Sequence, residues 1–421
     1  MQNQKFKILR KKYPKFIYQD YFYKLKGGNL EISFLFVIEP NIYFQPMIII
    51  KNVKKSQLKM VGDKILDNLI FHIGLIEILS YWKATCSPEI IIKAGYLNSE
   101  QLRWWKKLII NGMGQFFYEN QINFLEKNLF KIIVNNQTKK DEIFVKNLKN
   151  RCLVPFAGGR DSIVTLESLK KKKKKIMLFM VNPTKQILKT AKVSSVKKMI
   201  IVQRVIDKKL LDLNKKGFLN GHTPFTSVLS FISVLCAILF DCKNIVFSNE
   251  KSADEGNVKY LGRIINHQWA KSSEFEKIFK NYCRKYLAEN INYFSYLRKY
   301  GELEISKMFI KYPQYFSVFS SCNASMKIGA KKLRWCGKCP KCLFVYLTLY
   351  PFLENNELLK IFNKDFFQNK KLLPLMKSLI GEESIKPFEC VGTKKESQEA
   401  FKLCLKKAKK LRDIPYLLTK I

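Results

Sequence analysis

Acidic side chains and arginine are both scarce in this chain of 421 residues. Its 34 Asp and Glu stand against 76 Lys and Arg, which gives a formal net charge of +42 at pH 7. Only ten of the basic residues are Arg, and the other 66 are Lys. Proteins that read nucleic acids usually rely on Arg for bidentate contacts with bases. Because Lys carries the surplus, we interpret it as a bias in amino-acid composition and not as a nucleic-acid-binding surface. We therefore expect no specific nucleic-acid partner.

Long hydrophobic segments are missing as well. The apolar stretch at residues 225–240 has 16 residues and includes one Thr and three Ser, whereas a membrane-spanning helix needs about 20 residues. Residues 1–16 are basic and lack the apolar core of a secretory signal. Eleven cysteines without such a signal indicate a reducing compartment, where clustered thiols bind metals or do redox chemistry. We therefore predict a cytoplasmic protein with no membrane partner.

Apolar runs divide the chain into three parts. Residues 1–148 open with strand-like runs and continue with helical stretches, which predicts an α+β domain. Residues 149–310 alternate short apolar runs with helical patterns, and this alternation indicates a parallel sheet covered by helices on both faces. Residues 311–421 are predicted to be mostly helical and rich in cysteine. The predicted fold class is α/β, and ligands of such sheets bind at the carboxyl ends of the strands.

A glycine pair follows the first apolar run of the central part. The sequence Pro155-Phe-Ala-Gly-Gly-Arg-Asp-Ser162 places the pair between a predicted strand and a predicted helix. Glycines let the backbone approach phosphates closely, and the helix N-terminus adds a partial positive charge. Asp161 can hold Mg²⁺, Arg160 can offset phosphate charge and Ser162 can donate a hydrogen bond. Two glycines can also form a plain tight turn, but the charged residues that follow them favour a phosphate site.

This segment resembles the S-G-G-x-D-S signature of the PP-loop ATP pyrophosphatases, which cleave ATP to AMP and pyrophosphate while adenylating a substrate. The sequence departs from the signature at Ala157, which replaces a serine and removes one hydroxyl. It is not a Walker A loop, because no G-K-[ST] follows. The resemblance implies an adenine nucleotide α-hydrolase-like fold that uses ATP and Mg²⁺. The cofactor-binding residues that it implies are Ala157, Gly158, Gly159, Arg160, Asp161 and Ser162, with Asp161 on the Mg²⁺.

Four cysteines form a second pattern. Cys336, Cys339 and Cys342 are spaced by three, and Cys322 lies upstream. Four thiolates match the closed tetrahedral site of a structural Zn²⁺ ion. A redox pair or an iron–sulfur cluster is the alternative, but three close cysteines plus a fourth exceed what a redox pair needs. We predict structural zinc at these residues, and we expect most of the seven scattered cysteines to be buried as small apolar side chains.

Polar segments that include two of the three histidines follow the predicted strands. His222 stands at the start of the apolar helix, where an imidazole tends to be neutral. Glu250 and Glu255 lie in a polar stretch after a strand, and His267 and Lys271 lie in the next stretch. Each segment alone can be a capped turn. Three of them converging on one sheet edge favour an active site.

Taken together, these segments resemble the MurL family of UDP-N-acetylmuramoyl-L-alanyl-L-glutamate epimerases. The resemblance implies ATP- and Mg²⁺-dependent conversion of the terminal L-Glu of the UDP-linked muramoyl dipeptide to D-Glu, in peptidoglycan precursor synthesis. The residues considered for the proton transfers are His222, His267, Lys271, Glu250 and Glu255, while Cys322 fits better as a zinc ligand than as a base. The matching segments are residues 71–74, 81–84, 219–224, 248–257, 266–276, 321–323, 335–344 and 387–393.

Two other functions stay open at this point. A tRNA- or nucleobase-modifying PP-loop ATP pyrophosphatase would use the basic surface, but residues 1–148 carry no recognisable RNA-binding signature and the Lys excess is spread along the whole chain. A basic, zinc-containing binding protein would leave the loop at residues 157–162 unexplained.

If the Lys excess is compositional, affinity for duplex DNA or tRNA will be weak and unspecific. We expect binding to fall by roughly a hundredfold or more between about 50 mM and about 200 mM salt, because it would rest on counterion release alone. Fluorescence anisotropy with labelled tRNA and a duplex of scrambled sequence measures this. Tight binding of one RNA that persists at the higher salt would contradict the prediction.

Overall fold

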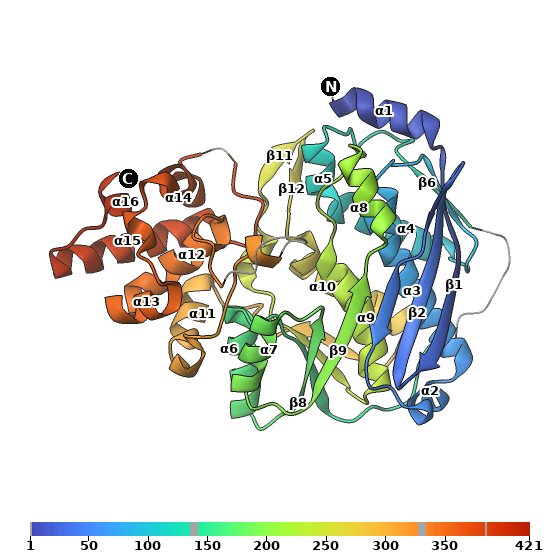
Figure 1. The fold of residues 1–421 in the computed structure, drawn as a ribbon, viewed down its shortest axis with the longest axis horizontal. Coiled ribbons are helices and arrows are strands. Elements are labelled where there is room, and N and C mark those ends of the chain that lie inside the picture. The colour runs from blue at the N-terminus through green and yellow to red at the C-terminus, as the bar shows by residue number, and fades with distance from the viewer. Residues whose placement is uncertain (1, 135–141, 327–333, 384) are drawn as a thin grey trace.

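The computed structural model describes residues 2–134, 142–326, 334–383 and 385–421. In this part of the chain, one sheet of 11 strands forms the centre of the molecule (Figure 1). Its order is β13-β10-β7-β8-β9-β4-β2-β1-β5-β6, with β3 paired to β2. The strands are β1 (Lys15–Lys26), β2 (Asn29–Ile38), β3 (Ile42–Phe44), β4 (Met47–Ile50), β5 (Glu89–Ile92), β6 (Lys131–Val134), β7 (Arg151–Pro155), β8 (Lys175–Val181), β9 (Met199–Val205), β10 (Asn244–Phe247) and β13 (Asn292–Ser295).

Five neighbouring strands of the sheet, from β13 to β9, run parallel to one another. They all come from the central part of the chain, where short apolar runs alternate with helices, and the predicted α/β fold is confirmed. Their carboxyl ends share one edge, at which the loops that follow them meet. The helices between them are α6 (Arg160–Lys171), α7 (Lys185–Val193), α8 (Lys208–Lys215), α9 (Phe225–Leu239) and α10 (Ser273–Tyr286).

The N-terminal strands continue this sheet. β4 pairs antiparallel with β9, so that Ile48 lies opposite Arg204 and Ile50 opposite Val202. β2 and β1 follow in antiparallel order, and β5 and β6 run parallel to β1. The predicted boundary between residues 1–148 and 149–310 therefore divides one hydrogen-bonded sheet, whereas the described residues of 311–421 add no strand to it. We keep the three-part division as a proposal about how the chain is organised.

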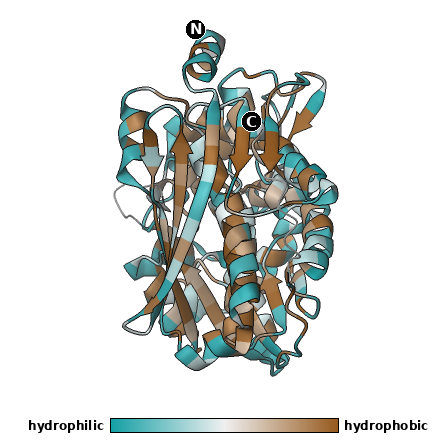
Figure 2. Ribbon diagram, turned by 90° about the vertical axis from the view of Figure 1, so that its right-hand side faces the viewer, coloured by the Kyte–Doolittle hydropathy of each residue, from teal (hydrophilic) through white to brown (hydrophobic). Residues whose placement is uncertain are grey.

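Two apolar helices lie at the centre of the core. α3 (Asp63–Trp82) packs against α9, and most side chains of both are buried. A helix that is apolar on all sides is expected to be covered on all sides. By length and composition α3 could cross a membrane, but 89% of its apolar 18-residue window is buried inside the protein. Figure 2 shows brown, hence hydrophobic, segments along many of the strands.

The remaining helices frame the sheet and the C-terminal part. In Figure 1 the C-terminal helices, orange to red, lie beside α6 and α7, and their apolar side chains share one core with Ile163 and Val164 of α6. The predicted helical, cysteine-rich region is confirmed. The other elements are α1 (Gln2–Lys12), α2 (Lys55–Val61), α4 (Ser99–Gly112), α5 (Gly114–Glu119), the hairpin β11 (Val258–Tyr260) and β12 (Arg263–Ile265), α11 (Glu302–Phe309), α12 (Pro340–Leu349), α13 (Asn355–Phe362), α14 (Leu373–Ile380), α15 (Lys394–Leu411) and α16 (Tyr416–Thr419).

Candidate active site

The glycine loop connects β7 to α6 at the carboxyl edge of the parallel strands. Gly158 has a φ of +70°, which glycine adopts without the penalty of a Cβ. Gly159 precedes α6 in an extended conformation, and no side chain caps the helix. The hydroxyl of Ser162 donates to the carbonyl oxygen of Gly159 at 2.9 Å and so holds the turn. An uncapped helix N-terminus offers N–H groups and a partial positive charge to an anion.

A segment of the C-terminal part lies directly on this loop. The amide of Ser320 donates to the carbonyl oxygen of Gly158 at 3.1 Å, and the amide of Arg160 donates to Ser321 Oγ at 3.4 Å. A Cβ on Gly159 would stand 3.0 Å from the same Oγ, so this approach favours glycine. Ser321 thus brings a hydroxyl to a loop whose first position, Ala157, has none. Sequence reasoning missed this contact, which joins residues 161 positions apart.

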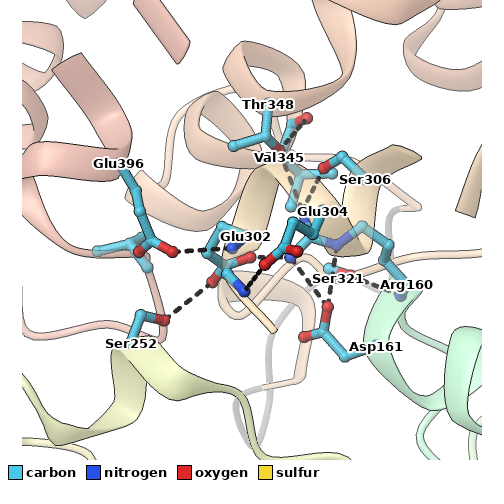
Figure 3. Close-up of polar contacts among 12 residues, drawn as sticks. Arg160, Asp161, Ser252, Glu302, Glu304, Ser306, Ser321, Val345, Thr348 and Glu396 are labelled. Atoms are coloured by element: carbon cyan, nitrogen blue, oxygen red, sulfur yellow. Dashed lines mark hydrogen bonds and ion pairs between the residues drawn. The ribbon is translucent and has the colours of Figure 1, made fainter. Parts of the chain in front are cut away.

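The side chain of Arg160 points into the protein instead of toward the loop (Figure 3). Its Nη1 donates to Ser306 Oγ at 2.9 Å and to Thr348 Oγ1 at 3.0 Å. Its Nη2 pairs with Glu302, and its Nε donates to Asp161 Oδ1 at 2.9 Å. We expected the guanidinium to offset phosphate charge. Its donors are instead hydrogen-bonded to protein groups, and the partners on α11 and α12 are themselves buried. The guanidinium ties Asp161 of the loop to α11 and to α12 of the C-terminal part.

Asp161 begins a cluster of charged side chains at the loop. Burial alone would raise the pKa of its carboxyl, but the charges of Arg160, Lys341 and Lys271 hold the pKa below its usual value. Glu250 is 2% exposed. Burial raises its pKa, Lys271 and Lys341 oppose the rise, and Asp161 adds to it. Two nearby carboxyl groups with pKa values shifted in opposite directions can divide the tasks of binding a cation and transferring a proton.

Lys271 ends a short helical turn, η2 (Trp269–Lys271), and reaches into the same cluster. Its Nζ donates to Cys390 Sγ at 3.1 Å. Burial would lower the pKa of this ammonium, but Cys390, Glu250 and Asp161 raise it above its usual value. The ammonium is therefore charged and surrounded by groups that can carry negative charge. Of the seven cysteines outside the Cys322–Cys342 group, six are buried as expected, and Cys390 is partly exposed.

The two histidines that the sequence singled out face each other, with ring centroids 4.4 Å apart. Gln115 orients the ring of His267: its Nε2 donates to Glu119 Oε1 at 2.7 Å, so its Oε1 accepts from His267 Nδ1. Nε2 of His267 is then the ring atom that can accept a proton. Burial and the charge of Lys271 lower the pKa of His267 to about 4. Burial and His267 lower the pKa of His222 well below its usual value, so both rings are neutral at pH 7.

Lys83, at the C-terminal end of α3, comes close to the histidine pair. Its Nζ donates to the carbonyl oxygen of Gly221, the residue before His222, at 2.7 Å. Burial and the charge of Arg204 lower the pKa of Lys83 to about 8. The amine is therefore positively charged at pH 7 and loses its proton near pH 8. Sequence reasoning missed Lys83, although it lies in one of the family-like segments.

Glu255 is engaged elsewhere. Its Oε1 accepts from the backbone amide of Lys394 at 3.1 Å and pairs with Lys386 Nζ at the same distance. The third histidine, His72, is buried in α3 between the carbonyl oxygen of Asn68 and the hydroxyl of Tyr282. The structure thus brings Asp161, Glu250, Lys271, His222 and His267 to one edge of the sheet and binds Glu255 to the C-terminal part.

The four predicted cysteines come together at the N-terminus of α12. The ligand atoms of Cys322, Cys336, Cys339 and Cys342 all lie within 4.8 Å of one another. The Sγ of Cys342 is 3.7 Å from that of Cys336 and 3.4 Å from that of Cys339. Around a tetrahedral zinc ion with Zn–S bonds of about 2.3 Å, neighbouring sulfurs are roughly 3.8 Å apart. The cluster therefore fits a metal ion such as zinc, and Cys322 belongs to it.

Comparison with known proteins identifies relatives over most of the chain. The MurL N-terminal domain matches residues 7–296, and the MurL C-terminal domain matches residues 318–419. A UDP-N-acetyl-alpha-D-muramoyl-L-alanyl-L-glutamate epimerase of Xanthomonas oryzae pv. oryzae is 32% identical over 79% of this chain and 74% of its own length. A protein of the same name from a Micromonospora species is 34% identical over 80% of this chain and 74% of its own length.

Among solved structures, a predicted subunit of tRNA methyltransferase from Methanocaldococcus jannaschii aligns with 38% of this chain and 75% of its own, at 15% identity and a TM-score of 0.26. A likeness of this size supports no conclusion about fold or function.

If the cysteine cluster is structural, the purified protein will contain about one zinc ion per chain. We expect Cys339→Ser to lose the ion and to lower Tm by at least about 5 °C, because binding of a structural metal contributes directly to folding. Plasma emission spectroscopy and thermal unfolding measure the two effects. Cys152→Ser, in β7, is the matched control, since it removes a buried thiol outside the cluster. Zinc-free wild-type protein of full stability would contradict the prediction.

Proposed function

This chain belongs to the MurL family, and from this premise we propose that it epimerises the terminal glutamate of UDP-MurNAc-L-Ala-L-Glu, using ATP and Mg²⁺. The strongest support is one juxtaposition: the charged cluster at Asp161 joins the glycine loop to a pair of neutral histidines. The charge of Lys271 acts on Asp161 and on both histidines. A phosphate-binding loop and groups able to accept a proton thus share one site.

The chemical difficulty lies in the α-hydrogen. Beside an ionised carboxylate it is very weakly acidic, because its removal concentrates negative charge on neighbouring atoms. Adenylation of the carboxylate replaces one oxygen by a leaving group and makes the carbonyl carbon electron-poor. ATP supplies the adenylyl group, and pyrophosphate leaves. Water then cleaves the adenylate after epimerisation and releases AMP.

The loop residues Ala157–Ser162 bind the phosphates in this proposal. Backbone N–H groups at the start of α6 face the anion, and the hydroxyl of Ser321 adds a polar group beside them. Asp161, whose carboxyl is kept ionised by its neighbours, is the residue that would hold Mg²⁺. The metal would neutralise charge on the phosphates as pyrophosphate leaves.

Proton transfer falls to the groups beyond the loop. His267 is the first candidate, because Gln115 fixes its ring and its Nε2 is unprotonated at neutral pH. His222 lies against it and can relay or replace it. Lys271 and Glu250 complete the set, whereas Glu255 is bound by Lys386 and Lys394 and serves the C-terminal packing.

The direct test is incubation with ATP, Mg²⁺ and the UDP-linked dipeptide, followed by acid hydrolysis and chiral analysis of the glutamate. We expect D-Glu to accumulate together with AMP and pyrophosphate, and neither to form without ATP. ATP-independent epimerisation, or AMP formation that requires a tRNA, would contradict the proposal. Family membership favours the epimerase over the tRNA-modifying alternative.

Asp161→Asn keeps the shape of the side chain and removes its charge. We expect it to lower AMP formation by roughly a hundredfold or more, because a positioned electrostatic contact is lost at the phosphates, and to leave the fold intact. Quenched-flow assay of AMP measures the effect, and circular dichroism checks the fold. Asp212→Asn is the matched control, since Asp212 lies on α8 with its side chain 59% exposed and pairs only with Lys215 among the described residues. Full ATP cleavage by Asp161→Asn would rule out its role.

His267→Asn should separate the two halves of the reaction. We expect AMP and pyrophosphate to form at close to the wild-type rate, while epimerisation falls by about 100-fold or more, the usual contribution of a general acid or base. Mass spectrometry of glutamate formed in D₂O measures exchange at the α-carbon. Parallel loss of AMP formation and exchange would show that His267 acts in binding or folding instead.

A further inference from the structure

Cys390 stands out among the groups that the reaction scheme above does not use. It lies outside the four-cysteine cluster, and it is the one partly exposed cysteine of the other seven. Its thiol touches Lys271, a residue already placed in the site. A cysteine that is partly exposed and in contact with an ammonium is positioned for chemistry and not for packing alone.

The backbone around Cys390 is fixed from both sides. The side-chain amide of Asn257 donates to the carbonyl oxygen of Pro387 at 2.8 Å, and that of Gln268 donates to Val391 O at 3.4 Å. From the metal-cluster side, Glu389 Oε2 accepts from the amide of Lys341 at 3.0 Å. The thiol is therefore held on a loop clamped between the central part and the C-terminal part, which gives it the fixed position that a reacting group needs.

Lys271 is itself held in place. Its backbone oxygen accepts from Nη2 of Arg298 at 2.6 Å, and Arg298 in turn pairs with Glu276 at 2.8 Å. The Nζ of Lys271 donates to the sulfur of Cys390 at 3.1 Å, so the ammonium lies directly against the thiol. The same charge also reaches His267. One cation thus contacts the thiol and acts electrostatically on the imidazole, although the thiol and the imidazole are more than one hundred residues apart in the sequence.

Epimerisation requires a proton to leave one face of the α-carbon and another to arrive on the opposite face. We propose that Cys390 Sγ is the acid–base group on one face and His267 Nε2 the group on the other. From one epimer the imidazole takes the α-proton: the C–H bond breaks, an N–H bond forms and the electron pair moves into the activated carbonyl. The thiol then donates its proton to the other face, and its electrons stay on sulfur beside Lys271. From the other epimer the thiolate takes the proton and the imidazolium returns one. This role rests on the proposed epimerase function.

Cys390→Ala tests the role when both epimers of the UDP-linked substrate are assayed in D₂O with ATP and Mg²⁺. We expect AMP formation within about threefold of wild type and epimerisation lowered by about 100-fold or more. One epimer should still exchange its α-hydrogen for deuterium without inverting, because His267 remains, and the other should neither exchange nor invert. His267→Asn should show the opposite asymmetry. Cys152→Ala, which removes a buried thiol at the far end of β7, should behave as wild type.

Four results would overturn the role. Normal epimerisation by Cys390→Ala would refute it and leave the epimerase function standing. Joint loss of AMP formation and of exchange from both epimers would mean that the thiol builds the site without moving a proton, and Cys390→Ser would then recover activity. A substrate adduct on Cys390, detected by intact mass spectrometry, would mean that sulfur attacks the activated carbonyl as a nucleophile. Absence of epimerisation by the wild-type enzyme would refute the proposed function and this role with it.

Discussion

The buried guanidinium of Arg160 is the interaction on which the rest of the site depends. A charge 1% exposed to solvent is costly unless its donors are satisfied, and here two carboxylates and two hydroxyls satisfy them (Figure 3). Those partners come from α6, α11 and α12. Moving the glycine loop relative to α11 and α12 would therefore leave a buried charge without its partners. In the observed arrangement Ser321 lies on the loop and the charge of Lys341 acts on Asp161.

The cysteine cluster lies at the start of α12, the helix that also supplies Thr348 to Arg160. Cys339 is the residue before α12, and Lys341 lies in the first turn of that helix. The amide of Lys341 binds Glu389, the neighbour of Cys390, and its charge acts on Asp161 and Glu250. A metal ion held by the four thiolates would fix the start of α12 and thereby the loop that carries Cys390. The cysteine cluster and the charged residues around Asp161 are thus connected through the first turn of α12.

The features that could be predicted from the sequence are those that depend on residues close together in the chain. The glycine loop between a strand and a helix, the spacing of Cys336, Cys339 and Cys342, and the alternation of strands and helices could all be read from a few consecutive residues. Two histidines flagged by their neighbours indeed face each other. What the sequence could not reveal depends on pairing across long separations. Arg160 pairs with Glu302, 142 positions away in the sequence, and Gln115 orients His267, 152 positions away.

The pairing of β4 with β9 bears on how the chain is made. These strands lie roughly 150 residues apart, and their union completes the single sheet. A ribosome delivers the chain from its N-terminus, so β4, with the sequence Met-Ile-Ile-Ile, emerges long before its partner exists. Until then it is an apolar strand with an unpaired edge, the kind of surface on which nascent chains associate wrongly. β4 is therefore synthesised well before the strand that covers its edge. We expect a chaperone to matter most to this chain between the synthesis of β4 and that of β9.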